Sequence, residues 1–375
     1  MYTAALVGCG RIGYSLGLDL KREQPASHTR AINENPRIKL VAGCDTDAQT
    51  LCAWGKANPS VAVYRDSLEM YANVHPDIVV VAVNERSHEK EAIEAVVSRP
   101  SLVILEKPVA LNIADALKIR DMAQRNSVPV MVNHERRFSR DYMLARKLVG
   151  EIGELDSVHG ILSSGMAVYN PNEEGSGAYS LLHDGTHLVD AVQFLLGEMR
   201  PVDVDSGKKS GLMKRALKFS REKDAAYSPM LKNPVLTGLL VDEKKCVRHV
   251  SAHYSLETCP DVALTFSGRS RYFGFEIDIR GTEGRVCIGN GFFKFYRRRE
   301  SVLYSGFHSL SREKIQIPER TGYFSNMVQS AVDFLDGKSP LLSSLRTGIE
   351  DLAVVEEIKE KIRQKASWKT GMQNP

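Results

Sequence analysis

Three closely spaced glycines follow an apolar segment at the start of the chain, and they leave few choices of fold. Residues 3–7 are small or apolar and run directly into Gly8, Gly10 and Gly13. Glycines at this spacing permit a tight turn, a close approach of the backbone to a pyrophosphate, and a helix start whose N–H groups favour anions. The preceding strand makes the match more specific, so the segment predicts a dinucleotide-binding unit.

A second predicted strand, 38–44, ends at Asp45. An acidic side chain there accepts hydrogen bonds from the ribose hydroxyls of adenosine and repels a 2′-phosphate, so Asp45 predicts NAD in preference to NADP. Asp45 lies 32 residues beyond Gly13, where about 20 is usual. We attribute the extra length to a surface insertion that breaks the first helix at Pro25, after which Ser27 is expected to N-cap a restarted helix.

Apolar strands continue to alternate with helical segments up to residue 133. The further strands are predicted at 77–83, 101–105 and 129–133, and the helices at 89–97 and 114–124. Strands that alternate with helices are typical of a doubly wound, parallel sheet. We therefore expect an α/β Rossmann domain over residues 1–133.

The strand at 101–105 delivers Glu106, Lys107 and Pro108 to its own carboxyl end. Ligands of open α/β sheets bind outside the carboxyl ends of the strands, so Lys107 is expected to face a ligand. Pro108 lacks an N–H group and favours an extended conformation for the residue before it, which makes the presentation of Lys107 rigid. The alternative is an ordinary solvated lysine at a strand end.

After residue 153 the pattern changes to longer alternating segments without regular helices between them. These segments are 155–165, 249–256, 262–267, 273–280, 285–288 and 292–297. They suit a large, mostly antiparallel open sheet, so we expect an α+β substrate-binding and oligomerisation domain over residues 134–375. A helix at 179–196 is embedded in it, and a final helix at 347–361 is a candidate to pack back towards the first domain. The uncovered sheet face favours a homodimer or homotetramer.

The composition excludes several classes of protein. The net charge is only +4, from 50 basic and 46 acidic residues, so no nucleic acid is expected as a partner. The six cysteines show no Cys-x-x-Cys spacing and are expected to be free thiols. No apolar run approaches the roughly 18 residues of a membrane span, and Met1 leads within three residues into a strand, so we expect neither a membrane anchor nor a signal peptide. A cytoplasmic location follows.

Residues 203–234 are rich in lysine and arginine and have little apolar periodicity. They are interpreted as an exposed excursion. Two roles remain open for it, a solvated loop or a lip that attracts an anionic substrate.

Together these motifs resemble the glucose-fructose oxidoreductase, inositol dehydrogenase and rhizopine catabolism (Gfo/Idh/MocA) family. The resemblance covers essentially the whole chain and rests most specifically on Glu106-Lys107-Pro108 and on the Gly-, His- and Asp-bearing segment 177–197. Further matches are Arg137-Phe138, Gly150-x-x-Gly153 and Gly281-Thr-Glu-Gly284. It implies a nicotinamide-dependent oxidoreductase that transfers hydride at a secondary hydroxyl or ketone of a sugar, an inositol or a sugar derivative.

The resemblance also implies roles for individual residues. Lys107 corresponds to the family lysine that hydrogen-bonds the reacting hydroxyl, and His187 to the histidine that takes its proton, a role that an imidazole suits. The implied cofactor contacts are Gly8, Gly10, Arg11, Ile12, Gly13, Asp45, Val83, Asn84, His88, Glu106 and Lys107. The expected substrate contacts are Lys107, Arg137, Tyr169, His183, Asp184 and His187. Two of them are expected from position alone: Arg137 lies just past the last strand of the first domain, where either the cofactor ribose or a substrate oxygen is its partner, and Tyr169 lies on the approach to the helix.

His183 departs from the family pattern, because an aspartate is usual four residues before the histidine. On one helix, His183 and His187 share a face, so His183 is expected to take the place of that carboxylate as a third catalytic residue, with a packed core histidine as the alternative. Asp190 either orients the His187 imidazole or is a structural acid. A metal site at the two histidines lacks a third ligand, so no metal is predicted.

Two other functions remain open at this stage. The same scaffold could reduce an imine or an unsaturated small molecule, with Lys107 and His187 acting as acids. A regulator that senses NAD without chemistry is the second, although such a protein has no need of either residue.

Overall fold

The computed structural model describes residues 1–197 and 229–371, with side chains up to residue 365. Most of the basic segment 203–234 lies outside the described residues. The described chain forms two compact units. The first comprises 1–139 and 320–349, and the second comprises 140–197, 229–319 and 350–371. The units therefore differ from a single division at residue 133, because residues 320–349 return to the first one.

In the described part of the first unit, six parallel strands form one sheet in the order β3-β2-β1-β4-β5-β6. They are β1 (Tyr2–Val7), β2 (Ile38–Cys44), β3 (Ala62–Tyr64), β4 (Ile78–Val81), β5 (Leu102–Leu105) and β6 (Val130–Val132). Strands β4 and β5 are buried at every position, as expected when helices cover both faces. The strand order reverses beside β1, where such sheets bind ligands. The predicted doubly wound sheet is confirmed.

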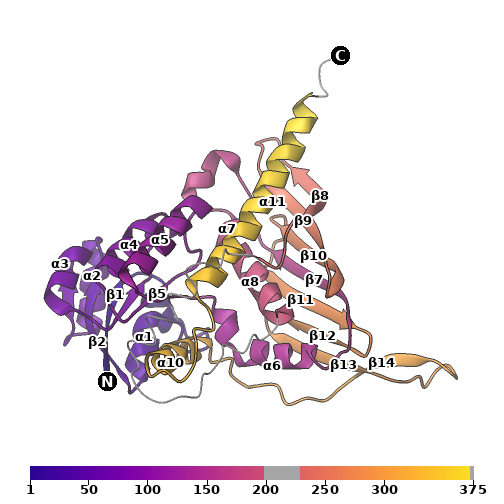
Figure 1. Ribbon diagram of the computed structural model, residues 1–375, viewed down its shortest axis with the longest axis horizontal. Helices are drawn as coiled ribbons and strands as arrows, with labels where there is room; N and C mark the ends of the chain where they lie inside the picture. Colours follow the sequence, from indigo (N-terminus) through magenta and orange to yellow (C-terminus); the bar gives the residue numbers. More distant parts are fainter. Residues whose placement is uncertain (198–228, 372–375) are drawn as a thin grey trace. The chain divides into compact units, whose positions relative to one another are not determined.

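Helices and short 3-10 turns connect these strands. They are η1 (Ser15–Leu18), α1 (His28–Glu34), α2 (Ala48–Ala57), α3 (Ser67–Val74), η2 (Glu85–Ser87), α4 (His88–Val97), α5 (Ile113–Asn126), η3 (Glu135–Phe138) and α10 (Tyr323–Leu335). In Figure 1, α10 lies beside α1, and its apolar residues join the core of this unit. This burial explains why a helix so late in the chain belongs to the first unit.

The segment after Gly13 differs from the expected helix. It forms turns and the short η1, because the carbonyl oxygens of Ile12 and Gly13 accept hydrogen bonds from the N–H groups of His28 and Thr29, at 3.1 and 2.9 Å. Those carbonyls are then not available to continue a helix from the glycine turn. The predicted restart is confirmed, since Ser27 N-caps α1 and its side chain accepts from the backbone N–H of Arg30.

The described part of the second unit contains a mostly antiparallel sheet in the order β14-β13-β12-β11-β7-β10-β9-β8, and among these described strands only β7 and β10 pair in parallel. Its strands are β7 (Leu155–Ser163), β8 (Val235–Val241), β9 (Val247–Leu256), β10 (Cys259–Ser267), β11 (Gly274–Gly281), β12 (Gly284–Gly289), β13 (Phe292–Glu300) and β14 (His308–Arg312). The expected sheet is confirmed. Edge strands β8 and β14 were not predicted, because their largely exposed side chains follow no alternation of buried and exposed positions.

The helical elements of the second unit are α6 (Arg140–Val149), η4 (Pro171–Ser176), α7 (Ser180–His183) and α8 (Gly185–Leu196). The final helix, α11 (Leu345–Gly371), begins in the residues of the first unit and continues in those of the second. Within the described ranges, no helix has both the length and the apolar composition that crossing a bilayer requires.

Candidate functional site

The glycine turn after β1 is shaped by close backbone packing. Gly8 has a φ of +95°, and a Cβ there would lie 2.4 Å from the carbonyl oxygen of Ala82, while a Cβ at Gly13 would lie 2.0 Å from the carbonyl oxygen of Gly8. At Gly10, in contrast, a Cβ would meet nothing within 4 Å. The first and third glycines are therefore required by packing, and the second borders open space where a ligand can approach the backbone.

Asp45 follows β2 and is fixed beside this turn. Its Oδ2 accepts a hydrogen bond from the backbone N–H of Cys9 at 2.9 Å, and its Oδ1 accepts one from the N–H of Asp47 at 2.9 Å. The side chain is half-buried. The structure thus brings the predicted ribose acceptor next to the predicted pyrophosphate turn. Arg11, Ile12, Val83 and Asn84 lie at the same carboxyl edge of the sheet.

Glu106 is 6% exposed and its carboxylate is held inside the first unit. Its Oε1 accepts a hydrogen bond from Asn133 Nδ2 at 2.7 Å and lies 2.7 Å from His28 Nε2. Burial by itself raises the pKa of Glu106, but the hydrogen bonds from His28 and Asn133 and the charge of Lys107 outweigh it and lower that pKa below its ordinary value. The carboxylate is therefore ionised, and it is engaged by protein groups.

His88 contacts Pro108, the residue that follows Lys107. Its Nδ1 lies 2.6 Å from the carbonyl oxygen of Pro108, and its Nε2 lies 3.1 Å from that of Val83. The ring is 1% exposed, and this burial lowers the pKa of His88, so the imidazole is neutral. A neutral imidazole carries a single N–H, so the ring packs between the ends of β4 and β5 and donates to only one of these two carbonyls.

Lys107 lies between these two anchored neighbours. Glu106 is held by His28 and Asn133, Pro108 is held by His88, and the Lys107-Pro108 peptide bond is cis. The Lys107 side chain itself is half-buried at the end of β5. The contacts of Glu106 and Pro108 thus anchor the backbone on both sides of Lys107.

Arg137, an expected substrate contact, is anchored within its own unit. It belongs to η3, is 8% exposed, and donates a hydrogen bond from its guanidinium to the carbonyl oxygen of Leu342 at 3.2 Å. The structure thus places this guanidinium against the backbone of its own unit.

The predicted single helix 179–196 is wrong at Asp184. This residue is a turn with φ −103° and ψ −22°, His183 is the last residue of α7, and His187 lies in the first turn of α8. The break coincides with Gly185, where a Cβ would lie 3.1 Å from the Phe266 ring and 3.2 Å from the Ser180 carbonyl oxygen. The two histidines therefore lie on either side of this turn, His183 at the end of α7 and His187 in the first turn of α8.

The side chains of this region differ in exposure. His183 and Asp184 are half-buried, whereas His187 is 8% and Asp190 only 1% exposed. Asp190 lies three residues after His187 within the same helix, α8. The mid-helix residues are buried because α8 packs on β7 and β10.

Tyr169 lies in a buried cluster instead of on a pocket wall. It is 0% exposed, packs edge to face on Tyr179 with ring centroids 5.4 Å apart, and donates its hydroxyl to Glu174 at 3.0 Å. Burial raises the pKa of Tyr169 to about 12. Lys359, also 0% exposed, pairs with Glu174 at 3.1 Å and with Glu356 at 2.6 Å. This cluster holds the segment before α7 against α11.

Sequence reasoning missed His28 and Asn133 in the first unit and the Lys359 cluster in the second. A usable signal existed for Asn133, because it ends a buried strand beside the one that carries Glu106. For His28 the only signal was its place after the Ser27 cap. No sequence pattern near Lys359 predicted its burial, because the residue lies in a helical segment rich in charged side chains.

Two family profiles match most of the chain. Residues 2–134 match that described as "Oxidoreductase family, NAD-binding Rossmann fold", and residues 146–370 match "Oxidoreductase family, C-terminal alpha/beta domain", both of the Gfo/Idh/MocA group. These assignments agree with the two sheets described above.

Curated relatives are more distant. D-apiose dehydrogenase of Paraburkholderia graminis is 26% identical over 209 residues, which are 53% of this chain and 50% of that protein. D-glucoside 3-dehydrogenase of Escherichia coli is 27% identical over 199 residues, 51% of this chain and 56% of that protein. The chain thus spans about half the length of the curated relatives it matches.

The fold is shared with solved structures over the full length. A dehydrogenase from Chromobacterium violaceum superposes with a TM-score of 0.73 at 14% sequence identity, covering 100% of this chain and 99% of that one. With both profiles matched, the chain belongs to the Gfo/Idh/MocA oxidoreductase family and combines an NAD(P)-binding Rossmann domain with the family's C-terminal α/β domain.

Proposed function

We propose that this protein is an NAD-dependent dehydrogenase that transfers hydride between a secondary hydroxyl of a sugar, an inositol or a sugar derivative and nicotinamide. The observation that carries the proposal is the carboxyl edge of the parallel sheet. It combines an open backbone position at Gly10, a fixed carboxylate at Asp45, and Lys107 between two anchored neighbours. The names of the sugar dehydrogenases among the relatives support the substrate class.

The residues present fit a nicotinamide dinucleotide. Gly10 leaves room at the backbone for a pyrophosphate, and Asp45 offers carboxylate oxygens to ribose hydroxyls while repelling a 2′-phosphate. These features favour NAD over NADP. When bound, the nicotinamide supplies the hydride acceptor.

The remaining chemistry is proton handling by the chain itself. An alcohol must lose its hydroxyl proton as hydride departs, and His187 is the proposed acceptor, because an imidazole has an ordinary pKa near 6.5. Lys107 donates a hydrogen bond to the same hydroxyl and stabilises the developing alkoxide with its positive charge. His183 is the proposed third contact to the substrate.

We also propose a cytoplasmic location and a homo-oligomeric state for this protein. All six cysteines are free, which supports a reducing, cytoplasmic location. Both edge strands of the antiparallel sheet expose apolar side chains, Val235 on β8 at 64% and Leu310 on β14 at 46%. Such exposure supports a homodimer or homotetramer.

The test is NADH formation over a panel of inositols, hexoses, amino sugars and sugar acids. Wild type is compared with Lys107→Met and His187→Ala, and the matched controls are Lys56→Met on α2 and His308→Ala on β14, both exposed. We expect turnover to fall about 100-fold or more in both site variants, while NAD binding and both controls stay near wild type. Tight NAD binding without turnover of any panel member would contradict the proposal.

A further inference from the structure

The helix that ends at His183 is too short to fix its own position. It comprises only the four residues Ser180–His183, and a helix of about one turn makes few internal hydrogen bonds, so its neighbours must hold it. The carbonyl oxygen of Tyr179 accepts a hydrogen bond from the N–H of His183 at 3.1 Å. The residue that precedes α7 is thus bonded directly to the residue that ends it, and a movement of Tyr179 is passed on to His183.

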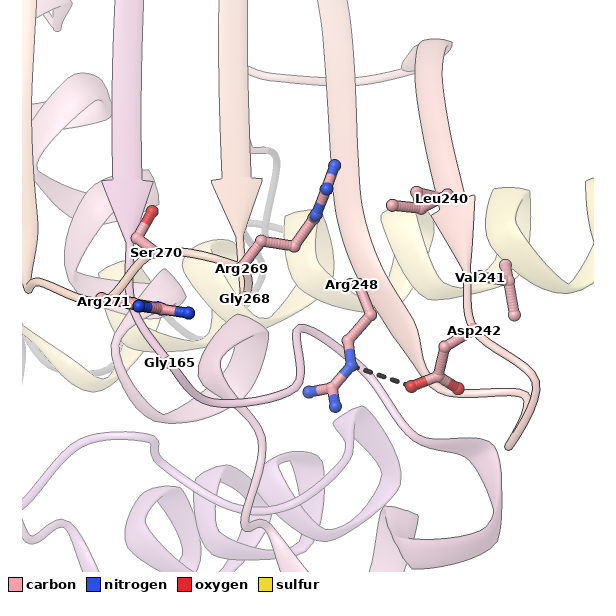
Figure 2. A pocket seen from close by; sticks show the side chains of 9 residues that line it. All are labelled: Gly165, Leu240, Val241, Asp242, Arg248, Gly268, Arg269, Ser270 and Arg271. Atoms are coloured by element: carbon pink, nitrogen blue, oxygen red, sulfur yellow. Dashed lines mark hydrogen bonds and ion pairs between the residues drawn. The ribbon is translucent and has the colours of Figure 1, made fainter.

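The antiparallel sheet holds the backbone at the start of α7. The carbonyl oxygens of Ala167 and Val168 accept hydrogen bonds from the N–H groups of the first two residues of α7, at 2.8 and 3.0 Å. The N–H of Val168 donates in turn to the carbonyl oxygen of Val247, at the start of β9, at 2.8 Å. The next residue of β9, Arg248, lines an open cavity of about 630 Å³ together with Arg269 (Figure 2). The start of α7 is therefore joined to the end of the sheet that borders this cavity.

The Tyr179 side chain is held by a different element, α11. It is 1% exposed, and the Lys359 ammonium lies 5.4 Å from the centre of its ring, within the range of a cation–π contact. The Tyr169 ring packs edge to face on the same ring, with centroids 5.4 Å apart. A shift of Tyr179 would therefore break its contact with Lys359.

Lys359 is itself fixed by ion pairs. Its Nζ lies 2.6 Å from Glu356 on α11 and 3.1 Å from Glu174 on η4. The Glu174 carboxylate also accepts two hydrogen bonds from the Arg363 guanidinium, at 2.8 and 2.9 Å. A buried ammonium without a partner is costly, so Lys359 stays where these carboxylates hold it. The buried cation thus gives the Tyr179 ring a fixed contact on α11.

We propose that Lys359 is a positioning residue: through the Tyr179 ring it sets the position of His183, the proposed substrate contact. All of these contacts lie within the second unit. The inference rests on the proposed function for the role of His183, and it adds a buried residue outside the site on which substrate binding depends. His187 belongs to α8, which packs on β7 and β10, so loss of Lys359 should change KM more than kcat.

A double-mutant cycle on KM tests the inference. The variants are Lys359→Met, His183→Ala and the two combined, with Lys361→Met on the same helix as the control. We expect each single change to raise KM for the substrate about tenfold, with kcat within about threefold, and Lys359→Met to raise KM no further once His183 is alanine. If the two changes multiply in KM, the effect of Lys359 does not pass through His183, and the inference is overturned.

Changes at Tyr179 test the same link from its other end, and they serve also if Lys359→Met fails to fold. Tyr179→Leu removes the ring and should reproduce the rise in KM, whereas Tyr179→Phe keeps the ring and should stay within about twofold of wild type. Lys359→Arg keeps the positive charge and should recover part of the loss. A purely structural role would lower the unfolding midpoint but leave KM of the folded enzyme unchanged. Wild-type KM in both Lys359→Met and Tyr179→Leu overturns the inference.

A measurement without substrate keeps the inference separate from the proposed function. The NMR signal of the His183 ring Cε1–H group is assigned by its loss in His183→Ala. It should shift in Lys359→Met and Tyr179→Leu, and stay near its wild-type position in Lys361→Met. An unchanged signal in the first two variants overturns the inference, whether or not the enzyme turns over a sugar. A shifted signal in a protein that turns over no sugar supports the link from Lys359 to His183 and counts against the dehydrogenase.

Discussion

His28 Nε2 lies 2.7 Å from Glu106 Oε1, although the two residues are 78 positions apart. Both side chains are buried, and the backbone N–H of His28 donates to the carbonyl oxygen of Ile12 in the glycine turn. One residue therefore ties the predicted pyrophosphate turn to the strand end that presents Lys107. The contact thus joins the turn proposed for the cofactor to the strand end proposed for catalysis.

Replacing His28 should damage both stability and catalysis. His28→Ala removes a hydrogen-bond partner from the buried Glu106 carboxylate, which we expect to lower the free energy of unfolding by about 1–3 kcal/mol. Since Lys107 follows Glu106 directly, kcat should fall about tenfold with a smaller change in NAD affinity. Denaturant unfolding and steady-state kinetics measure the two effects.

The matched control is Asp66→Ala, which removes the N-cap of α3 (Asp66 Oδ1 accepts from the Glu69 N–H at 2.8 Å) at a cost of about 1 kcal/mol. It should leave kcat unchanged. An equal loss of kcat in both variants would mean that His28 acts through stability alone.

The ionised state of Glu106 should affect how the stability of the folded protein falls at acidic pH. The pKa of Glu106 is lowered in the folded protein, so its contribution is present above its unfolded pKa of about 4.3 and is lost as the pH falls through the lower folded value. Glu106→Gln should therefore be less stable at neutral pH and lose less stability on acidification below about pH 4.3. Urea midpoints at stepped pH test this. If the urea midpoints of wild type and variant fall equally on acidification, the result would argue against a lowered pKa of Glu106.

His88 should contribute a pH dependence nearer neutrality. Burial lowers its pKa in the folded protein, so its contribution is complete above the unfolded pKa of about 6.5 and is lost as the pH falls through the folded value. His88→Asn should reduce the dependence of the thermal unfolding midpoint on pH between about pH 6.5 and pH 5. His308→Asn, exposed on β14, is the control and should reproduce the wild-type profile. If the thermal midpoint of the His88 variant depends on pH as steeply as that of wild type, the result would contradict a neutral, buried His88 ring.

Asp45 should govern the choice of cofactor. Asp45→Ala removes the carboxylate beside the glycine turn, so we expect KM for NAD to rise about tenfold and the preference for NAD over NADP to shrink by a similar factor. Asp121→Ala, an exposed acid on α5, serves as the control for net charge. The measurement is kcat/KM with each cofactor at fixed substrate. Retention of the full NAD preference in the Asp45 variant would remove this residue from the cofactor site.

Lys359 should stabilise the second unit. The ammonium is fully buried beside Glu174 and Glu356, which keep partial exposure of 34% and 25%. Lys359→Met leaves both carboxylates without this partner, and because they are partly solvated we expect a loss of about 1–3 kcal/mol. Lys361→Met, two positions along α11, is the control. Equal unfolding midpoints for the two variants would show that the buried pairing contributes nothing net.

Much of the fold was predictable because its signals are local. Buried parallel strands are short runs of β-branched residues, and Ser27 caps α1 through a contact only three residues away. The same holds for the position of Lys107, since a strand end and a following proline constrain it without reference to the rest of the chain. Edge strand β14 gave no such signal, because every one of its residues is exposed.

The sequence by itself determined the glycine turn, the acid after β2, the lysine after β5 and the change from a parallel to an antiparallel sheet. Each depends on neighbours within one element or turn. Only the tertiary structure decided that His28 holds Glu106, that the predicted helix breaks at Asp184, that Tyr169 is buried on Lys359, and that Arg269 faces an open cavity. These outcomes depend on which distant elements pack together, and the energy of that packing is not encoded in any single stretch of chain.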